Sequence, residues 1–383
     1  MWGDLDPAPF AWLEEEEHRA LAIALEQQRG SGARNLVAAV LTGTVALWTF
    51  LVALALMKDG ARGLASILGT VVDGVMNALG LGWLGALVVL SGSPVAASSL
   101  ALLEGGSLSS FESYAMIVGS RLGAAFVVLV VGVLYAVRGN VERRRTPISV
   151  GVLALTMTAI AYVPGGLAGG ILLGSGALDE VTLTPPRAVF DLIGAVTSPI
   201  VGPIESVLPP NGPLEGAALF AIGMAALLIS FRLVDRLLPS LESARGDERA
   251  RWYIGPWAMF GTGLVVTLVT LSVAVSLSLL VPLVAKGYVR REQTLPYIAG
   301  SNISTLADTL LVAILLDSST APRLVIALLI GVTAWTLALL LFASRVTRRL
   351  VFGTQAVALR SPLHLVTFVG ALLSCPLLLL LVG

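Results

Sequence analysis

The sequence predicts an all-α polytopic membrane protein, an inverted repeat with two re-entrant helical hairpins and about eight transmembrane spans. First, 56% of the residues are hydrophobic and 13% are charged, against about 25% charged in soluble domains. Second, uncharged runs cover 36–57, 146–178, 252–285, 324–344 and 365–383, and about 20 residues cross a hydrocarbon core of roughly 30 Å. Third, residues 81–125 align without a gap to residues 262–306.

The amino-terminal residues 1–35 are predicted to form a cytoplasmic, acidic, amphipathic segment. Four consecutive glutamates begin at Glu14, and no apolar core precedes residue 36, so no cleavable signal is expected. Residues 36–212 and 213–383 then form the first and second transmembrane repeats. The formal net charge is zero, so no overall field points to nucleic acid as a partner.

The repeated segments predict the two hairpins, at about 82–105 and about 259–287. The uncharged run 252–285 is longer than one ordinary span needs, which suits a helical hairpin. Each copy has a small, serine-containing stretch in its middle and continues through Gly-Ser into a further apolar run. The aligned pairs include Leu90/Leu271, Ser91/Ser272, Gly119/Gly300 and Ser120/Ser301.

Charge predicts the orientation of the spans. Lys and Arg gather at 138–145, 236–251, 286–291 and 345–360, and the positive-inside rule places these loops in the cytoplasm. The two hairpins then dip into the membrane from opposite sides. Residues 189–207 must be re-entrant or interfacial for this to hold; if they span, the repeats become parallel or another segment fails to cross. Segments 58–80 and 237–256 are expected to be interfacial helices.

Hydroxyl groups in both hairpins suggest a binding site. Ser91, Ser93, Ser98 and Ser99 lie close together around a glycine and a proline, and a hairpin tip there would leave free backbone N–H groups for an anion. The alternative is that small residues allow close helix packing. Ser272, Ser276 and Ser278 in the second copy favour the binding interpretation.

With these motifs the chain resembles the type II sodium–phosphate cotransporter family. That family has two inverted hairpins with a Gln-Ser-Ser-Ser motif, each followed by a helix that starts Gly-Ala/Ser-Asn-Ile-Gly-Thr-Thr. Residues 300–305 (Gly-Ser-Asn-Ile-Ser-Thr) match the second helix start and 119–123 match the first with an altered centre. Residues 57–60 and 190–194 resemble two further family elements. The resemblance implies phosphate transport coupled to sodium.

The chain departs from the family at the hairpin motifs. Leu90 and Leu271 stand where the family has glutamine, and only Ser91, Ser93 and Ser272 remain of its polar side chains there. Leucine offers no oxygen to a hard cation. The sequence therefore predicts weak or absent sodium dependence, and no other cofactor is expected.

Two charges fall inside apolar segments. Arg121 occupies the position of Asn302 in the other repeat, and Asp308 interrupts an otherwise uncharged run over 293–316. A charge at the centre of a membrane helix costs about 2.5–3.5 kcal/mol on insertion scales. Either charge could be accommodated without a functional role. Arg121 could extend to the membrane interface, and Asp308 could form hydrogen bonds only to Thr305 or Thr309. The repeat symmetry instead predicts an Arg121–Asp308 contact or a cavity that both share.

The sequence thus favours a secondary transporter of inorganic phosphate or a similar small anion in the plasma membrane. The residues expected to contact or line the substrate are Ser91, Ser93, Ser98, Arg121, Ser272, Ser276, Asn302 and Thr305, with Asp308 in a coupling or counter-charge role. The alternative is a non-transporting membrane scaffold subunit derived from the same fold. An enzyme is not expected, because no nucleophile–base pair, metal cluster or phosphate-binding glycine loop is recognisable; the glycines at 165–176 suggest packing. Besides the bilayer, a homodimer or a partner membrane subunit is compatible with the chain.

Overall fold

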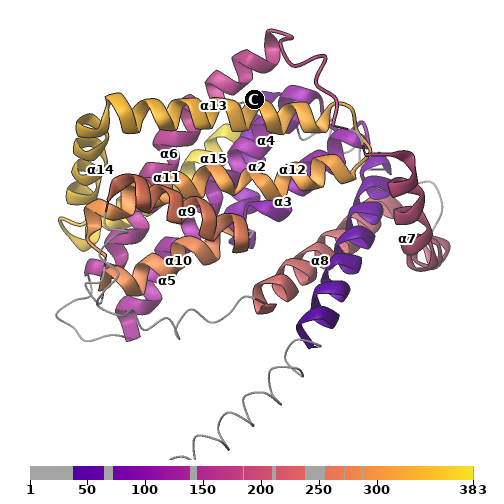
Figure 1. The fold of residues 1–383 in the computed structure, drawn as a ribbon, viewed down its shortest axis with the longest axis horizontal. Helices are drawn as coiled ribbons and strands as arrows, with labels where there is room; N and C mark the ends of the chain where they lie inside the picture. Colours follow the sequence, from indigo (N-terminus) through magenta and orange to yellow (C-terminus); the bar gives the residue numbers. More distant parts are fainter. Residues whose placement is uncertain are drawn as a thin grey trace, which may run out of the picture.

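The computed structural model describes residues 38–63, 72–138, 145–183, 185–208, 213–237, 255–270, 272–285 and 289–382. These ranges contain helices and no strands (Figure 1). Eight of the described helical segments are long and apolar enough to cross a membrane, so the protein is a multi-pass membrane protein. The acidic segment 1–35 lies outside the described residues.

Each repeat contains a long helix, a hairpin, a broken helix and a second long helix, in that order. The first repeat has the helix Ala38–Gly63, α2 (Val75–Val89), α3 (Ser93–Glu104), α4 (Ser110–Ala124), α5 (Phe126–Arg138) and α6 (Arg145–Gly174). The second has α8 (Pro213–Leu237), α9 (Pro256–Thr270), α10 (Val273–Ala285), α11 (Arg291–Ser304), α12 (Leu306–Leu315) and α13 (Ala321–Phe342). Two amphipathic helices follow equivalent points, α7 (Arg187–Val207) after α6 and α14 (Ser344–Ala358) after α13. The final helix is α15 (Pro362–Val382).

The hairpin arms are too short to cross a membrane singly. They have 15, 12, 15 and 13 residues, which at 1.5 Å per residue gives roughly 18–23 Å against a core of about 30 Å. Each pair of arms is therefore a re-entrant hairpin with its turn at the serine-containing stretch. The first arms begin at Val75 and Pro256, earlier than the sequence predicted.

The prediction of one interfacial helix over 58–80 is wrong, because the two ends of this range belong to two different helices. Its first part continues the helix Ala38–Gly63, because Ala61 is buried and continues the apolar face of that helix. Its last part belongs to α2, and 64–71 lies outside the described residues. Most of the second predicted interfacial helix, over 237–256, also lies outside them.

Glycines hold each hairpin against the broken helix of its own repeat. At each of them a Cβ would collide with a carbonyl oxygen of the facing helix, so only glycine permits this approach. The colliding pairs are Gly82–Met116 and Gly119–Leu79 in the first repeat, and Gly263–Tyr297 and Gly300–Phe260 in the second. The residues of the two sets occupy equivalent positions in the alignment that relates the two sequences. The repeat is therefore present in the structure as well as in the sequence.

Corresponding helices of the two repeats run antiparallel. In the α6–α13 contact, a Cβ on Gly165 would lie 2.8 Å from Val332 Cα and one on Gly169 would lie 2.5 Å from the Ala327 carbonyl oxygen. Residue numbers thus rise along α6 as they fall along α13. The first helix and α8, side by side in Figure 1, show the same sense, since Gly60 faces Phe220 and Ala46 accepts a hydrogen bond from Ser230. The repeats are therefore inverted, and the glycines of α6 serve packing.

Helix α7 lies at the edge of the molecule (Figure 1). By length and composition it is also a candidate span. However, antiparallel α6 and α13 require an even number of crossings between them, and α8 with the α11–α12 segment already supplies two. Of the α7 side chains only Thr197 and Val201 are buried, and Trp48 of the first helix donates to the Val196 carbonyl at 3.1 Å. The directions of α6 and α13 therefore indicate that α7 does not cross the membrane.

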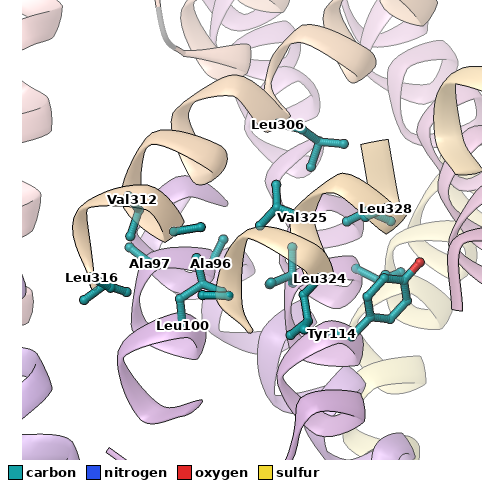
Figure 2. Close-up of a cluster of buried hydrophobic side chains, with 14 of the residues drawn as sticks. Ala96, Ala97, Leu100, Tyr114, Leu306, Val312, Leu316, Leu324, Val325 and Leu328 are labelled. Carbon is teal, nitrogen blue, oxygen red and sulfur yellow. The ribbon is translucent and has the colours of Figure 1, made fainter. Parts of the chain in front are cut away.

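The largest apolar core lies where α3, α12 and α13 meet. Figure 2 shows small side chains of α3 facing larger ones of α12 and α13, which lets the helices approach closely. Its labelled residues on these helices are Ala96, Ala97, Leu100, Leu306, Val312, Leu324, Val325 and Leu328. This core fixes the position of α12, and α12 carries Asp308.

Candidate functional site

The first hairpin tip rests on the broken helix α4. Leu90 ends α2 in the left-handed conformation, at a φ of 55°, and the chain turns through Ser91 and Gly92 into α3. A Cβ on Gly92 would lie 2.8 Å from the carbonyl oxygen of Ser120. Ser93 is buried at the first position of α3 and Ser91 is partly exposed. The tip therefore lies against the residue that precedes Arg121.

The second tip is held by hydroxyl groups. Ser272 accepts a hydrogen bond from the Val275 backbone N–H at 3.3 Å, which satisfies one free donor at the start of α10. Ser276 lies 2.6 Å from Thr267, 3.0 Å from the Tyr297 hydroxyl and 3.2 Å from Ser301 (oxygen to oxygen). These groups tie both arms of the second hairpin to α11.

Breaks in the two spanning helices bring Arg121 and Asp308 together. Arg121 is in the last turn of α4 and Asp308 in the first turn of α12. Each charge therefore lies at the helix end whose dipole favours it, the cation at a carboxyl end and the anion at an amino end. The Arg121 Nη2 atom is 3.4 Å from Asp308 Oδ1, which is the contact that the sequence predicted.

Two threonines complete this ion pair. Arg121 Nη1 donates to Thr305 Oγ1 at 3.0 Å, and Nη2 donates to Thr309 Oγ1. Thr309 in turn donates to Asp308 Oδ1 at 2.9 Å. Arg121 is 2% exposed and Asp308 5% exposed, and they are the only charged side chains buried in the described part of the chain. Arg121 therefore does not reach the membrane interface.

Helix α6 contributes two residues that the sequence analysis missed. Tyr162 donates its hydroxyl to the Asn302 carbonyl at 2.6 Å, and Thr158 donates to Asn302 Oδ1 at 3.2 Å. A tyrosine inside an apolar membrane run needs a hydrogen-bond partner, and that need was the available signal. Asn302 occupies the repeat position equivalent to Arg121, one helical turn before Thr305, which Arg121 contacts.

Three buried polar atoms of this cluster have no hydrogen-bond partner among the described residues. They are Arg121 Nε, Asp308 Oδ2 and Asn302 Nδ2, and only Trp83 and Thr336 supply other such side-chain atoms. An unpartnered buried donor or acceptor costs about 1–3 kcal/mol. The cluster therefore has two unpartnered donors, which can bond an oxygen acceptor, and one unpartnered carboxylate oxygen, which can accept from a donor.

Some residues that were predicted to contact the substrate instead form contacts within the hairpins. Ser98 donates to the Pro94 carbonyl at 2.8 Å within α3 and lies 3.7 Å from the Met224 sulfur. Ser276 belongs to the hydroxyl group cluster of the second hairpin. The structure thus gathers Arg121, Asn302, Thr305 and Asp308, with Ser91 and Ser93 at the adjoining tip, while Ser98, Ser272 and Ser276 support the hairpins.

A cavity of about 360 Å³ opens at the amino-terminal ends of α9 and α11. Arg290, Arg348 and Glu292 line it, together with the buried Met157 and other residues of α11 and α14. Both arginines belong to the basic regions that the positive-inside rule places in the cytoplasm. Met157 is the α6 residue before Thr158, and the cavity lining contains no residue of the Arg121 cluster.

Comparison of the chain with protein-family models, with curated proteins and with solved structures gives no match.

Proposed function

We propose that the chain is a secondary transporter of a small inorganic oxyanion, with phosphate as the first candidate, in the plasma membrane. Inverted repeats with discontinuous helices and sites near the repeat interface are the architecture of many secondary transporters. The observation that carries the proposal is the buried Arg121 cluster. It lies between two broken helices and offers the unpartnered donors Arg121 Nε and Asn302 Nδ2.

In this proposal Arg121 is the main anion ligand. Its planar guanidinium can bond two oxygens of one oxyanion, which a lysine cannot do. Asn302 and Thr305 line the site, and the tip at Ser91 and Ser93 supplies hydroxyl and backbone N–H groups when the hairpins move. The cytoplasmic cavity with its two arginines is the inner access route. Ser98 and Ser276 hold the hairpins in shape.

The proposal is consistent with the resemblance to type II sodium–phosphate cotransporters, but it does not couple phosphate transport to sodium in the way that family does. Leucine at both glutamine positions leaves a sodium ion without those two amide oxygens. Arg121, a permanent cation, replaces part of the positive charge that a bound sodium ion would bring. Phosphate transport is therefore expected to need little or no sodium.

A non-transporting scaffold subunit is the second candidate, and one observation favours it. In this structure Asp308 already neutralises Arg121, and the two threonines occupy two of its donors. A scaffold would keep this pair closed and bind no anion. The orphaned Nε and Nδ2 atoms oppose that reading, because a closed structural pair gains stability by satisfying them.

Uptake of radiolabelled phosphate into proteoliposomes tests the proposal. We expect saturable uptake that is competed by unlabelled phosphate and changes little when a sodium gradient is imposed. A steep, saturable sodium requirement would show that other oxygens rebuild the cation site. No uptake and no exchange above protein-free liposomes would reject transport and favour the scaffold.

A further inference from the structure

Asp308 is a buried carboxylate with one oxygen left free. Its Oδ1 atom receives Arg121 and Thr309, while Oδ2 has no partner among the described residues. The sequence analysis assigned it a coupling or counter-charge role without naming a coupled ion. A fixed counter-charge is enough to neutralise Arg121 while the site is empty. It opposes anion binding, however, because an arriving oxyanion must compete with Asp308 for Arg121.

The net charge of the site in each state identifies what resolves this conflict. The empty site holds one cation and one carboxylate, which sum to zero. A singly charged oxyanion added to that pair leaves an uncompensated negative charge in a buried place, which is strongly unfavourable. If Asp308 gains a proton as the anion binds, the loaded site is neutral again.

We propose that Asp308 takes up one proton for each singly charged oxyanion bound, so that the protein is a proton–oxyanion symporter. This inference rests on the proposed function. The proton passes from water to Oδ2, converting the carboxylate to a carboxylic acid, and no other bond is made or broken. Arg121 then turns its Nε and Nη2 donors to the anion, and Thr309 continues to hold Oδ1. Release on the other side returns the proton to water and restores the ion pair.

Of the charged and titratable groups named here around α12, Asp308 is the one carboxylate that faces the Arg121 site and could carry the proton. Arg121 of α4 and Tyr162 of α6 face the site itself. At the far end of α12, Lys58 donates to the Leu316 carbonyl at 3.2 Å and lies 3.5 Å from Glu104 of α3. On α13, Arg323 bonds the Val181 carbonyl at 3.2 Å and lies 3.6 Å from Asp179. Each of these flanking groups already has its own partner at the edge of the membrane.

The experiment uses the full-length protein in sodium-free proteoliposomes with the membrane potential clamped near zero. For one proton per singly charged anion, an external pH one unit lower should concentrate labelled phosphate about tenfold inside at steady state. A protonophore should abolish this accumulation. A trapped pH dye should report proton influx when phosphate is added to the wild-type protein.

Asp308→Asn tests the proton carrier. Its side chain cannot take up the proton, so we expect the pH-driven accumulation of phosphate to be lost. Because external pH also changes the ionisation of phosphate, this variant controls for that effect. Glu104→Gln, a matched acid-to-amide change at the hairpin edge, should keep the full pH-driven accumulation.

The outcomes distinguish the two proposals. Net phosphate uptake by the wild type without proton influx, or pH-driven accumulation by Asp308→Asn, would overturn proton coupling and leave transport standing. If Asp308→Asn does not fold, the wild-type dye measurement decides alone. Absence of exchange in the wild type would overturn the proposed function and this inference with it.

Discussion

At the scale of single residues, the account depends on a charge pair that the membrane core makes costly. Removing two charges from water is unfavourable by several kcal/mol each, and only good geometry and additional hydrogen bonds compensate. Here the pair has two threonine partners and two helix dipoles of the correct sign. A stabilising role alone would be served better by apolar side chains, so the pair indicates function.

The first prediction concerns folding stability. Arg121→Asn leaves Asp308 as an unpaired buried charge and should destabilise the protein by about 3–5 kcal/mol, seen as a lower melting temperature in detergent. The double variant Arg121→Asn/Asp308→Asn removes both charges and should recover most of the loss. A single variant as stable as the wild type would show that Asp308 does not depend on Arg121.

Sequence reasoning found the two charges because a charge in an apolar run stands out. It did not find Thr158 and Tyr162, because their role depends on how α6 is rotated about its axis toward α11. The glycines of α6 that pack against α13 determine that rotation. The residues around position 162 show no sequence pattern from which it could be predicted. Thr309 was named only as a hydrogen-bond partner of Asp308, which it is, and its bond to Arg121 was not foreseen.

At the scale of helices and hairpins, glycines set the positions of the hairpins. The repeat alignment predicted the hairpins and their turns because serines and glycines recur at corresponding positions. It did not predict where the first arms begin, since an apolar arm and an interfacial helix with small residues have similar compositions. The packing of α2 and α9 along their broken helices decides those boundaries.

Two glycines of α9 provide a matched test. Gly263→Ala places a Cβ against the Tyr297 carbonyl and should destabilise the protein by roughly 1–3 kcal/mol or more. Gly261→Ala, two residues earlier, meets nothing within 4 Å and should be neutral or slightly stabilising, because alanine favours helix. Thermal unfolding of the two variants checks this. Equal melting temperatures would contradict the close hairpin contact.

At the scale of the whole molecule, the antiparallel contact of α6 and α13 decides the topology. Charge distribution alone predicted an inverted repeat but left the crossing of residues 189–207 open. The structure resolves this because the direction of two long helices constrains every segment between them. The proline pair within α7, Pro199 and Pro203, is compatible with a helix that lies along a surface.

Cysteine labelling tests this topology in a Cys375→Ser background. Glu180→Cys and Ser206→Cys flank most of α7 and are exposed positions. Both should react with an impermeant maleimide from outside the cell. Arg348→Cys, on α14, should react only after permeabilisation. Labelling of Glu180→Cys and Ser206→Cys from opposite sides would mean that α7 crosses the membrane and that the repeat is not inverted.

The central claim is that the buried Arg121 cluster binds an inorganic oxyanion, and equilibrium binding of radiolabelled phosphate to the purified protein tests it most directly. The account predicts saturable binding to the wild type, weaker binding to Arg121→Lys, which keeps the charge but loses the two-oxygen geometry, and none to the folded double variant Arg121→Asn/Asp308→Asn. Phosphate binding by that double variant with wild-type affinity would contradict the claim.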